Sequence, residues 1–110
     1  MKVDITGRHI EITEPLRKFA TDRVERLHSV GDEIQEVHFI FTVEKHQRHV
    51  AEAKVKTKHD LHVGQEESTD MYTSIASVID KIEKQILRSK DKVVTRKRHG
   101  EARETVEPEA

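Results

Sequence analysis

The sequence predicts an α+β fold, a two-layer sandwich in which two helices cover one face of a four-stranded sheet, with the order β-α-β-β-β-α. Two observations predict it. In four segments apolar residues alternate with polar ones, as in half-buried strands, and in two longer segments they recur every three or four positions, as in amphipathic helices. Because each helix has a single apolar face, both should cover the same side of the sheet and leave its other side in water.

The first strand is expected over residues 1–6, where alternation puts Val3 and Ile5 on one face, and Gly7 permits the turn that follows. The helix that comes next is long enough to be a crossover between parallel strands. The later strands have short connections, so we expect them to form an antiparallel meander.

The first helix is expected to begin after Thr13, whose hydroxyl suits an N-cap, and to end near Gly31. Arg23 falls within its apolar stripe, so we expect its aliphatic stem to pack at the rim and its guanidinium to point outward. The other residues of the stripe are Leu16, Phe19, Ala20, Val24 and Leu27.

Alternation returns in three later segments. The second strand is expected from residue 34 to about residue 45, and Leu61 and Val63 begin a short final strand, after which residues 66–70 lead into the second helix. The inward-facing residues are Val37, Phe39, Phe41 and Val43 in the second strand and Ala51, Ala53, Val55 and Thr57 in the third.

The second helix, from residue 70 to about residue 92, has two opposed faces. Its apolar stripe consists of Tyr72, Ile75, Ile79, Ile82 and Ile86. At about 100° per residue a second row centres on the opposite side, and its members are all cations: Lys81, Lys84, Arg88 and Lys92. Such a helix can hold a polyanion on a rigid scaffold, although a solvated helix surface has the same pattern.

The charge of the chain is unevenly distributed. Residues 81–98 include eight basic and two acidic residues, a net of +6, whereas residues 99–110 include four glutamates and one arginine, a net of −3. The formal net charge of −1 therefore conceals a basic helix followed by an acidic tail. We expect one α+β domain over residues 1–95 and a basic-then-acidic flexible tail over residues 96–110.

The composition disfavours several classes of function. The absence of cysteine excludes disulfides, thiolate catalysis and Cys-ligated zinc. No signal peptide and no apolar run of membrane length is visible, so a cytoplasmic protein is expected. The pairs His46/His49 and His59/His62 flank opposite ends of the third strand, which at roughly 3.3 Å per residue is too long for them to share an ion. Without a Gly-x-Ser-x-Gly elbow or a Gly-rich phosphate loop, we expect no enzyme, cofactor or metal site.

The basic residues point instead to a nucleic-acid partner. The first helix adds Arg17, Lys18, Arg23 and Arg26, and two adjacent helices would present one cationic surface. Such a surface contacts phosphates and fixes position without reading sequence. The chain has too few aromatic residues for the stacking platforms of single-strand binders, so structured RNA, recognised by shape and backbone, is the better match.

Two segments of the chain resemble the family of ribosome hibernation-promoting factors and ribosome-associated translation inhibitors. The stretch Asp70-Met71-Tyr72, then Ile79-Asp80-Lys81-Ile82, Lys84-Gln85 and Lys90-Asp91-Lys92, is similar to the long C-terminal helix of that family. The segments Ile5-Thr6-Gly7, Glu11-Ile12-Thr13-Glu14, Leu16-Arg17 and Phe19 are similar to its start. The resemblance covers about residues 1 to 98.

The resemblance implies a fold similar to double-stranded RNA-binding domains. It also implies binding to the small ribosomal subunit in the channel used by mRNA and tRNA, where the family inhibits translation and preserves ribosomes during stationary phase or stress. A membrane or a small-molecule substrate is not implied, and we expect a monomer when the protein is free. Carried over to this chain, contact with 16S rRNA falls on Arg23, Arg26, Lys81, Lys84, Arg88, Lys90 and Lys92. Some of these positions exchange Lys and Arg, which keeps a phosphate contact but alters its geometry.

Three alternatives stay open. The core helix is similar to short hibernation factors, which favour ribosome dimers, whereas Gly100-Glu101-Ala102-Arg103 and the glutamates after it resemble a shortened form of the tail of the translation inhibitor, which opposes dimers. With 110 residues, we expect no second domain of the kind that long-form factors have. The remaining interpretations are a general double-stranded RNA-binding module and a protein-interaction module that acts on transcription.

Overall fold

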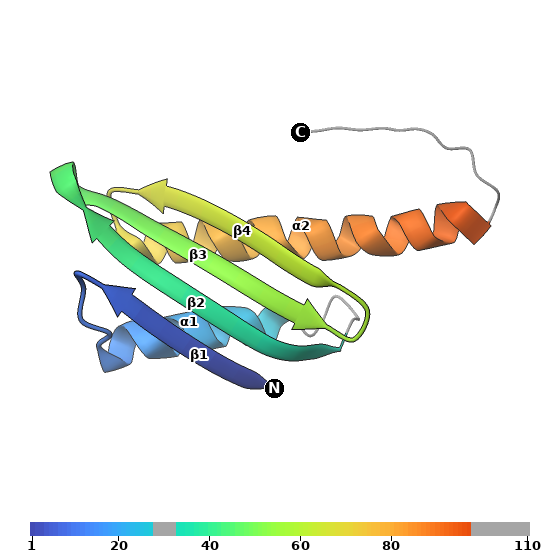
Figure 1. Ribbon diagram of the computed structural model, residues 1–110, viewed down its shortest axis with the longest axis horizontal. Helices are drawn as coiled ribbons and strands as arrows, with labels where there is room; N and C mark the ends of the chain where they lie inside the picture. The colour runs from blue at the N-terminus through green and yellow to red at the C-terminus, as the bar shows by residue number, and fades with distance from the viewer. Residues whose placement is uncertain (28–32, 98–110) are drawn as a thin grey trace.

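The computed structural model describes residues 1–27 and 33–97, with side chains as far as Arg88. The element order is the predicted one (Figure 1). The elements are β1 (Lys2–Arg8), α1 (Glu14–Leu27), β2 (Ile34–Glu44), the short 3₁₀ turn η2 (Lys45–Gln47), β3 (Arg48–Thr57), β4 (Leu61–Ser68) and α2 (Met71–Lys97). Gly31, the expected end of the first helix, and the part of the expected tail beyond residue 97 lie outside the described residues.

The four strands form one mixed sheet in the order β1-β2-β3-β4. β1 pairs with β2 in parallel, and the other two pairs are antiparallel, as a helical crossover followed by short turns requires. Figure 1 shows both helices on one face, with α1 behind β1 and β2 and α2 behind β3 and β4. The predicted two-layer α+β sandwich is confirmed.

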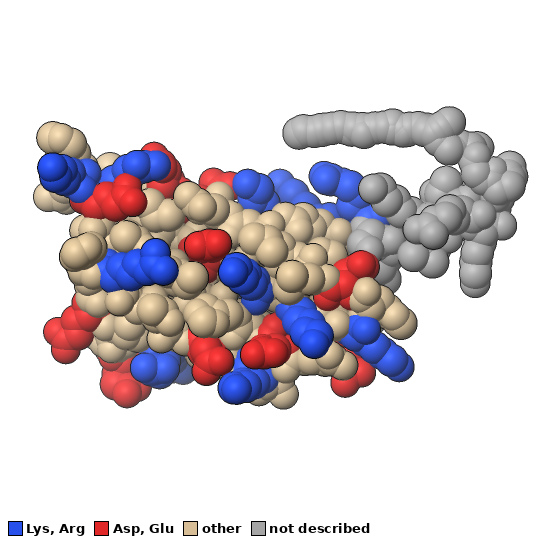
Figure 2. Space-filling view, viewed as in Figure 1, with Lys and Arg blue, Asp and Glu red and all other residues tan. Residues whose placement is uncertain are grey.

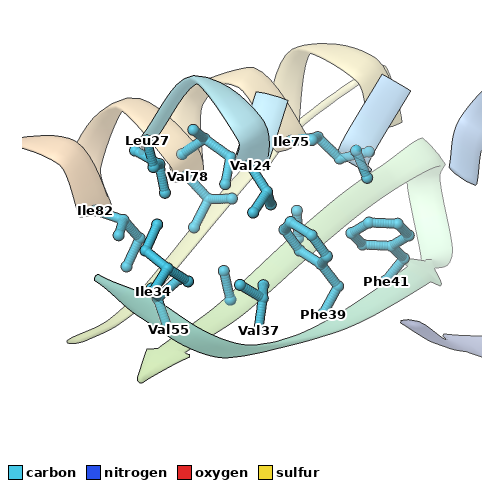
Figure 3. Packing of buried hydrophobic residues seen from close by; sticks show 14 of the residues in the cluster. Val24, Leu27, Ile34, Val37, Phe39, Phe41, Val55, Ile75, Val78 and Ile82 are labelled. Atoms are coloured by element: carbon cyan, nitrogen blue, oxygen red, sulfur yellow. The ribbon is translucent and has the colours of Figure 1, made fainter. Parts of the chain in front are cut away.

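The core lies between the sheet and the two helices (Figure 3). Alternation in β2 turns Val37, Phe39 and Phe41 toward the helices, where all three are fully buried. The predicted inward set of β3 is buried as well. Within the described residues, no helix is both long enough and apolar enough to cross a lipid bilayer.

Both helices begin at side-chain caps. Thr13 Oγ1 accepts a hydrogen bond from the backbone N–H of Leu16 at 3.3 Å, so the predicted N-cap of α1 is confirmed. At the start of α2, Asp70 Oδ2 accepts the N–H of Thr73 at 3.0 Å. Each cap satisfies a backbone donor that the first helical turn leaves free, which stabilises a helix by about 1 kcal/mol.

Tyr72 departs from the predicted apolar stripe of α2. Its exposed fraction is 38%, and the first turn of the helix buries Met71 instead. The reason is angular, because Tyr72 precedes Ile75 by three residues and so lies about 60° from it around the helix axis, at about 100° per residue. On that side of α2 its ring packs edge-to-face against Phe19 of α1, with ring centroids 5.0 Å apart.

β4 is longer than predicted, and its apolar residues lie on the open face of the sheet. The strand has eight residues and continues to Ser68. Leu61 and Val63 are 63% and 44% exposed. His62 and Gly64, which alternate with them, are the residues that face α2.

Contacts with β4 also hold α2 close to the edge of the sheet. A Cβ atom at Gly64 would lie 3.4 Å from side-chain carbons of Ile82 and Val78, an ordinary contact distance, so these side chains of α2 lie directly over this residue of β4. The side-chain amide of Gln85 donates a hydrogen bond to the carbonyl of Val63 at 2.9 Å. This bond covers part of the unpaired edge that β4 would otherwise present to solvent.

Gly7 lies within a strand and not in a turn, because β1 continues to Arg8. A Cβ atom at Gly7 would lie 2.7 Å from the carbonyl oxygen of Ile10 and 2.9 Å from Cδ1 of Ile12. Real Cβ atoms do not approach a backbone oxygen so closely. The requirement for glycine therefore comes from the segment that folds back over β1.

Alanine substitutions at the two glycines should differ in effect. We expect Gly7→Ala to lower the free energy of unfolding by about 2 kcal/mol, because its methyl group overlaps the backbone at Ile10. Gly64→Ala should leave it unchanged or raise it by about 0.5 kcal/mol, because its contacts are of ordinary length and alanine restricts the unfolded chain. Urea denaturation followed by circular dichroism measures both. Equal losses at the two positions would contradict this account.

Candidate nucleic-acid interface

The rotation of α2 about its axis decides which of its cations reach solvent. Ile75, Ile82 and Ile86 have no exposed surface and belong to the core cluster, so the opposite side of the helix faces outward. That side carries Lys81, Lys84 and Arg88, which are all exposed and which we call the basic row. The prediction of an apolar face opposed to a basic one is confirmed for these residues.

Lys81 lies at the side of α2 that borders β4. Its Nζ forms an ion pair with Oε2 of Glu66 at 3.2 Å, and the two side chains are 49% and 35% exposed. Lys81 Cδ also lies near Gly64, which confirms the position beside the strand. Because exposed ion pairs contribute only about 0–1 kcal/mol, Lys81 can exchange Glu66 for a phosphate at small cost.

Lys84 and Arg88 lie farther from the protein's own carboxylates. Lys84 Nζ is 3.9 Å from Oδ2 of Asp80, one turn earlier on the helix, and both side chains are largely exposed. Arg88 is exposed and forms no ion pair with any of the side chains that the structure describes. Lys90 and Lys92 belong to α2, which runs past the end of the sheet in Figure 1, but their side chains lie outside the described residues.

The two predicted cations of α1 have different surroundings. Arg23 is half-buried, and its guanidinium carbon lies 5.0 Å from the centre of the Phe19 ring, in a cation–π contact. The expectation that its stem packs at the rim of the core is therefore confirmed. Arg26 is exposed in the last turn of α1.

The structure separates the basic row from the cations of α1. The ring contact with Phe19 shows that Tyr72 lies on the side of α2 that faces α1. Lys81 follows nine residues later, about half a turn around the helix at roughly 100° per residue, and contacts β4 on the other side. The helices therefore present two basic areas, the basic row and Arg23 with Arg26, in place of the single continuous surface that we expected.

The open face of the sheet is not a basic surface. Figure 2 shows Lys and Arg interspersed with Asp and Glu across this face. The register of β2 and β3 places Lys56 beside Glu36. Arg48 donates hydrogen bonds to Glu67 at 2.7 Å and to Glu44 at 2.8 Å. The hydrogen bond to Glu67, with the negative charges of Glu67 and Glu44, raises the pKa of the Arg48 guanidinium.

One histidine of each pair, His49 in β3 and His62 in β4, lies in a strand, whereas His46 and His59 are exposed in the connecting turns. His62 lies in β4 and is 6% exposed, and its Nε2 atom has no hydrogen-bond partner among the described residues. Nδ1 of His49 is also buried without one. In the described part of the chain, no three histidine or carboxylate side chains gather in a way that would hold a metal ion.

Sequence reasoning missed the carboxylate beside Lys81. Asp80 precedes Lys84 by four residues, so that pairing can be read from helical spacing alone. Glu66 reaches Lys81 only because β4 pairs beside β3 and α2 crosses over both, which no local pattern indicates. The aromatic contact between Phe19 and Tyr72 was missed for the same reason.

A family model described as sigma 54 modulation protein / S30EA ribosomal protein matches residues 3–94 of this chain. The chain belongs to this family. The matched segment contains both basic areas and also Lys90 and Lys92. The match to the S30EA family thus covers nearly all of the residues that the structure describes.

Curated relatives in the S30EA family carry a functional name. A protein of Pseudomonas putida named ribosome hibernation promoting factor is 37% identical over 92 residues, which cover 84% of this chain and 89% of the relative. The protein of the same name in Escherichia coli K12 is 36% identical over 93 residues, which cover 84% of this chain and 97% of the relative.

Two solved structures have the same fold as this chain. The N-terminal domain of Thermus thermophilus Protein Y superimposes with a TM-score of 0.75 at 25% identity, covering 81% of this chain and 99% of that domain. A ribosomal subunit interface protein from Coxiella burnetii superimposes with a TM-score of 0.73 at 29% identity, covering 83% of this chain and 99% of that protein.

Removing the carboxylate beside Lys81 should strengthen binding to a polyanion. We expect Glu66→Gln to raise the affinity for heparin about twofold, because an exposed ion pair of about 0.5 kcal/mol no longer competes for Lys81. Glu36→Gln on the open face is the matched control, since it changes the net charge equally and should have a smaller effect. Isothermal titration at fixed salt measures both, and equal gains would show that the basic row is not the binding surface.

Proposed function

We propose that this protein is a ribosome hibernation factor. It binds the small ribosomal subunit through 16S rRNA in the channel used by mRNA and tRNA, inhibits translation and stabilises inactive ribosomes in stationary phase or stress. Membership of the S30EA family and the names of its relatives support the proposal. A further support is the structural neighbour described as a ribosomal subunit interface protein. The place of action is the cytoplasm, where ribosomes translate.

The observation that carries the proposal is the basic row. Its three cations are exposed on a helix whose opposite side is buried in the core, so their positions are held by the fold and not by the ligand. Because the helix backbone is already ordered, binding a phosphate restricts only the cation's side chain. Their ion pairs with Glu66 and Asp80 are exposed and weak, and so can be replaced by rRNA phosphates.

The rRNA contacts fall on Arg23, Arg26, Lys81, Lys84, Arg88, Lys90 and Lys92. Since the basic row and the two arginines of α1 lie on different sides of α2, they contact different stretches of rRNA. Two separated contacts orient the domain as well as hold it. Phosphate contacts of this kind fix the register of a protein on RNA without reading its bases.

Inhibition follows from occupancy and needs no catalytic step. A folded domain seated in the decoding channel excludes mRNA and tRNA by volume. Binding should weaken steeply with salt, because a protein that makes about five phosphate contacts has a log–log slope of about −4.5, at about 0.9 per contact for a duplex. The resemblance of the helix to short hibernation factors leads us to propose that the protein favours ribosome dimers.

Reversing the charge of the basic row should abolish binding. We expect the triple variant Lys81→Glu, Lys84→Glu, Arg88→Glu to lose co-sedimentation with small subunits, since three attractions become repulsions while the buried side of α2 is unchanged. Sucrose gradients measure it, and gradients of whole ribosomes with the unchanged protein should show a ribosome dimer peak.

The matched control is Lys45→Glu, Lys54→Glu, Lys58→Glu. These lysines are exposed and lie outside the two helices, and the variant has the same change in net charge. It should still co-sediment. If the basic-row variant binds like the unchanged protein, or if the two variants lose binding equally, the assigned surface is wrong. Fewer dimers on addition of the unchanged protein would instead identify the tailed inhibitor type.

A further inference from the structure

Two of the four aromatic residues lie outside the core, at the seam between the helices. Phe39 and Phe41 are fully buried, whereas Phe19 is half-buried and Tyr72 is 38% exposed. Tyr72 does not fill a core position, since Met71 does so in the same helical turn. Tyr72 is therefore the most exposed of the four aromatic rings.

The geometry leaves one face of the Tyr72 ring free of aromatic contacts. The rings of Phe19 and Tyr72 are 5.0 Å apart at 79°, so Phe19 occupies at most one face of the tyrosine and holds it in place. The guanidinium of Arg23 packs over Phe19 itself. The Tyr72 hydroxyl has no hydrogen-bond partner among the described residues, so no internal hydrogen bond requires tyrosine here.

A cation contacts the same phenylalanine ring as Tyr72 does. Arg23 is fixed by its contact with Phe19, and Arg26 follows one turn later on α1. An exposed aromatic ring with arginines on the neighbouring helix matches the chemistry of an unpaired nucleotide, because the base can stack on the ring while a nearby phosphate binds an arginine. Structured RNA displays such bases in its loops and bulges, where they can be splayed out.

We propose that Tyr72, supported by Phe19 and with Arg23 at its side, stacks on one unpaired nucleobase of the bound RNA. The proposal rests on the proposed binding to rRNA and adds to it a contact that is not electrostatic. A regular duplex has no free base to offer. The Tyr72 site therefore favours folded rRNA with an exposed base over a plain double helix, which phosphate contacts alone cannot do.

The test measures affinity for purified small subunits at several salt concentrations. Tyr72→Leu keeps an apolar contact with Phe19 but removes the aromatic face, so we expect about a tenfold loss, within the range of base–aromatic stacking. The salt slope should stay unchanged, because no phosphate contact is lost. Tyr72→Phe retains the ring and should bind within about twofold of the unchanged protein. Leu61→Ala, at an exposed apolar residue on the open face, is the control and should have no effect.

Two outcomes would overturn the stacking site. One is that Tyr72→Leu, with its thermal stability unchanged, binds within twofold of the unchanged protein. The other is a reduced salt slope, which would show that the substitution acts on the cations. A failure of the unchanged protein to bind small subunits would instead overturn the proposed function, so the two failures are distinguishable.

A second measurement does not depend on the folding of a variant. Tyr72 is the single tyrosine of the chain, so nitration by tetranitromethane reports on it alone. A stacked base should slow nitration at least fivefold in the complex with small subunits, and Tyr72 would be equally reactive in the free and bound protein if no base covers it. Mass spectrometry of the digested protein gives the extent of nitration.

Discussion

The packing of the isoleucine stripe of α2 against β3 and β4 is the constraint on which the rest of the structure depends. Each fully buried isoleucine contributes about 1.5–3 kcal/mol, whereas the exposed ion pair between Lys81 and Glu66 contributes about 0–1 kcal/mol. The hydrophobic contacts therefore set the rotation of the helix, and the ion pair follows from it. The same rotation turns the basic row outward, turns Tyr72 toward α1 and brings Gln85 to the edge of β4.

The pairing of cations with the protein's own carboxylates differs between the two faces of the molecule. On the open face, Arg48 is bound by two glutamates and the neighbouring charges alternate in sign, so little field extends into solvent. On α2, Lys81 and Lys84 each have one weak partner and Arg88 has none that the described side chains provide. We therefore expect the exposed side of α2 to attract a polyanion more strongly than the open face does, with Glu66 and Asp80 reducing that attraction.

Local patterns predicted the parts of the fold that local physics determines. Alternation identified the inward residues of β2 and β3, and the hydroxyl of Thr13 identified the start of α1. The helical spacing of the isoleucines and lysines placed them on opposite sides of α2. These features depend on neighbours within a few positions along the chain, which is why one sequence is enough to find them.

Features that depend on the packing of distant segments were not predicted. The sequence predicts Gly7 to be a turn residue, because it does not show that the chain at Ile10 folds back over β1. The spacing of Tyr72 from Ile75 predicts a core residue. The contact of its ring with Phe19 of α1 shows instead that it lies between the two helices. The separation of the two basic areas has the same origin, since helical spacing fixes angles about one axis and says nothing of where the neighbouring helix lies.

The central claim is that the fold directs the basic row, and not the open face of the sheet, toward the ribosome. Lysine acetylation measured by mass spectrometry, on the free protein and on its complex with small subunits, tests it most directly. The account predicts that Lys81 and Lys84 become protected in the complex while Lys54 and Lys56 stay as reactive as in the free protein. Protection of Lys54 and Lys56 with Lys84 still reactive would contradict it.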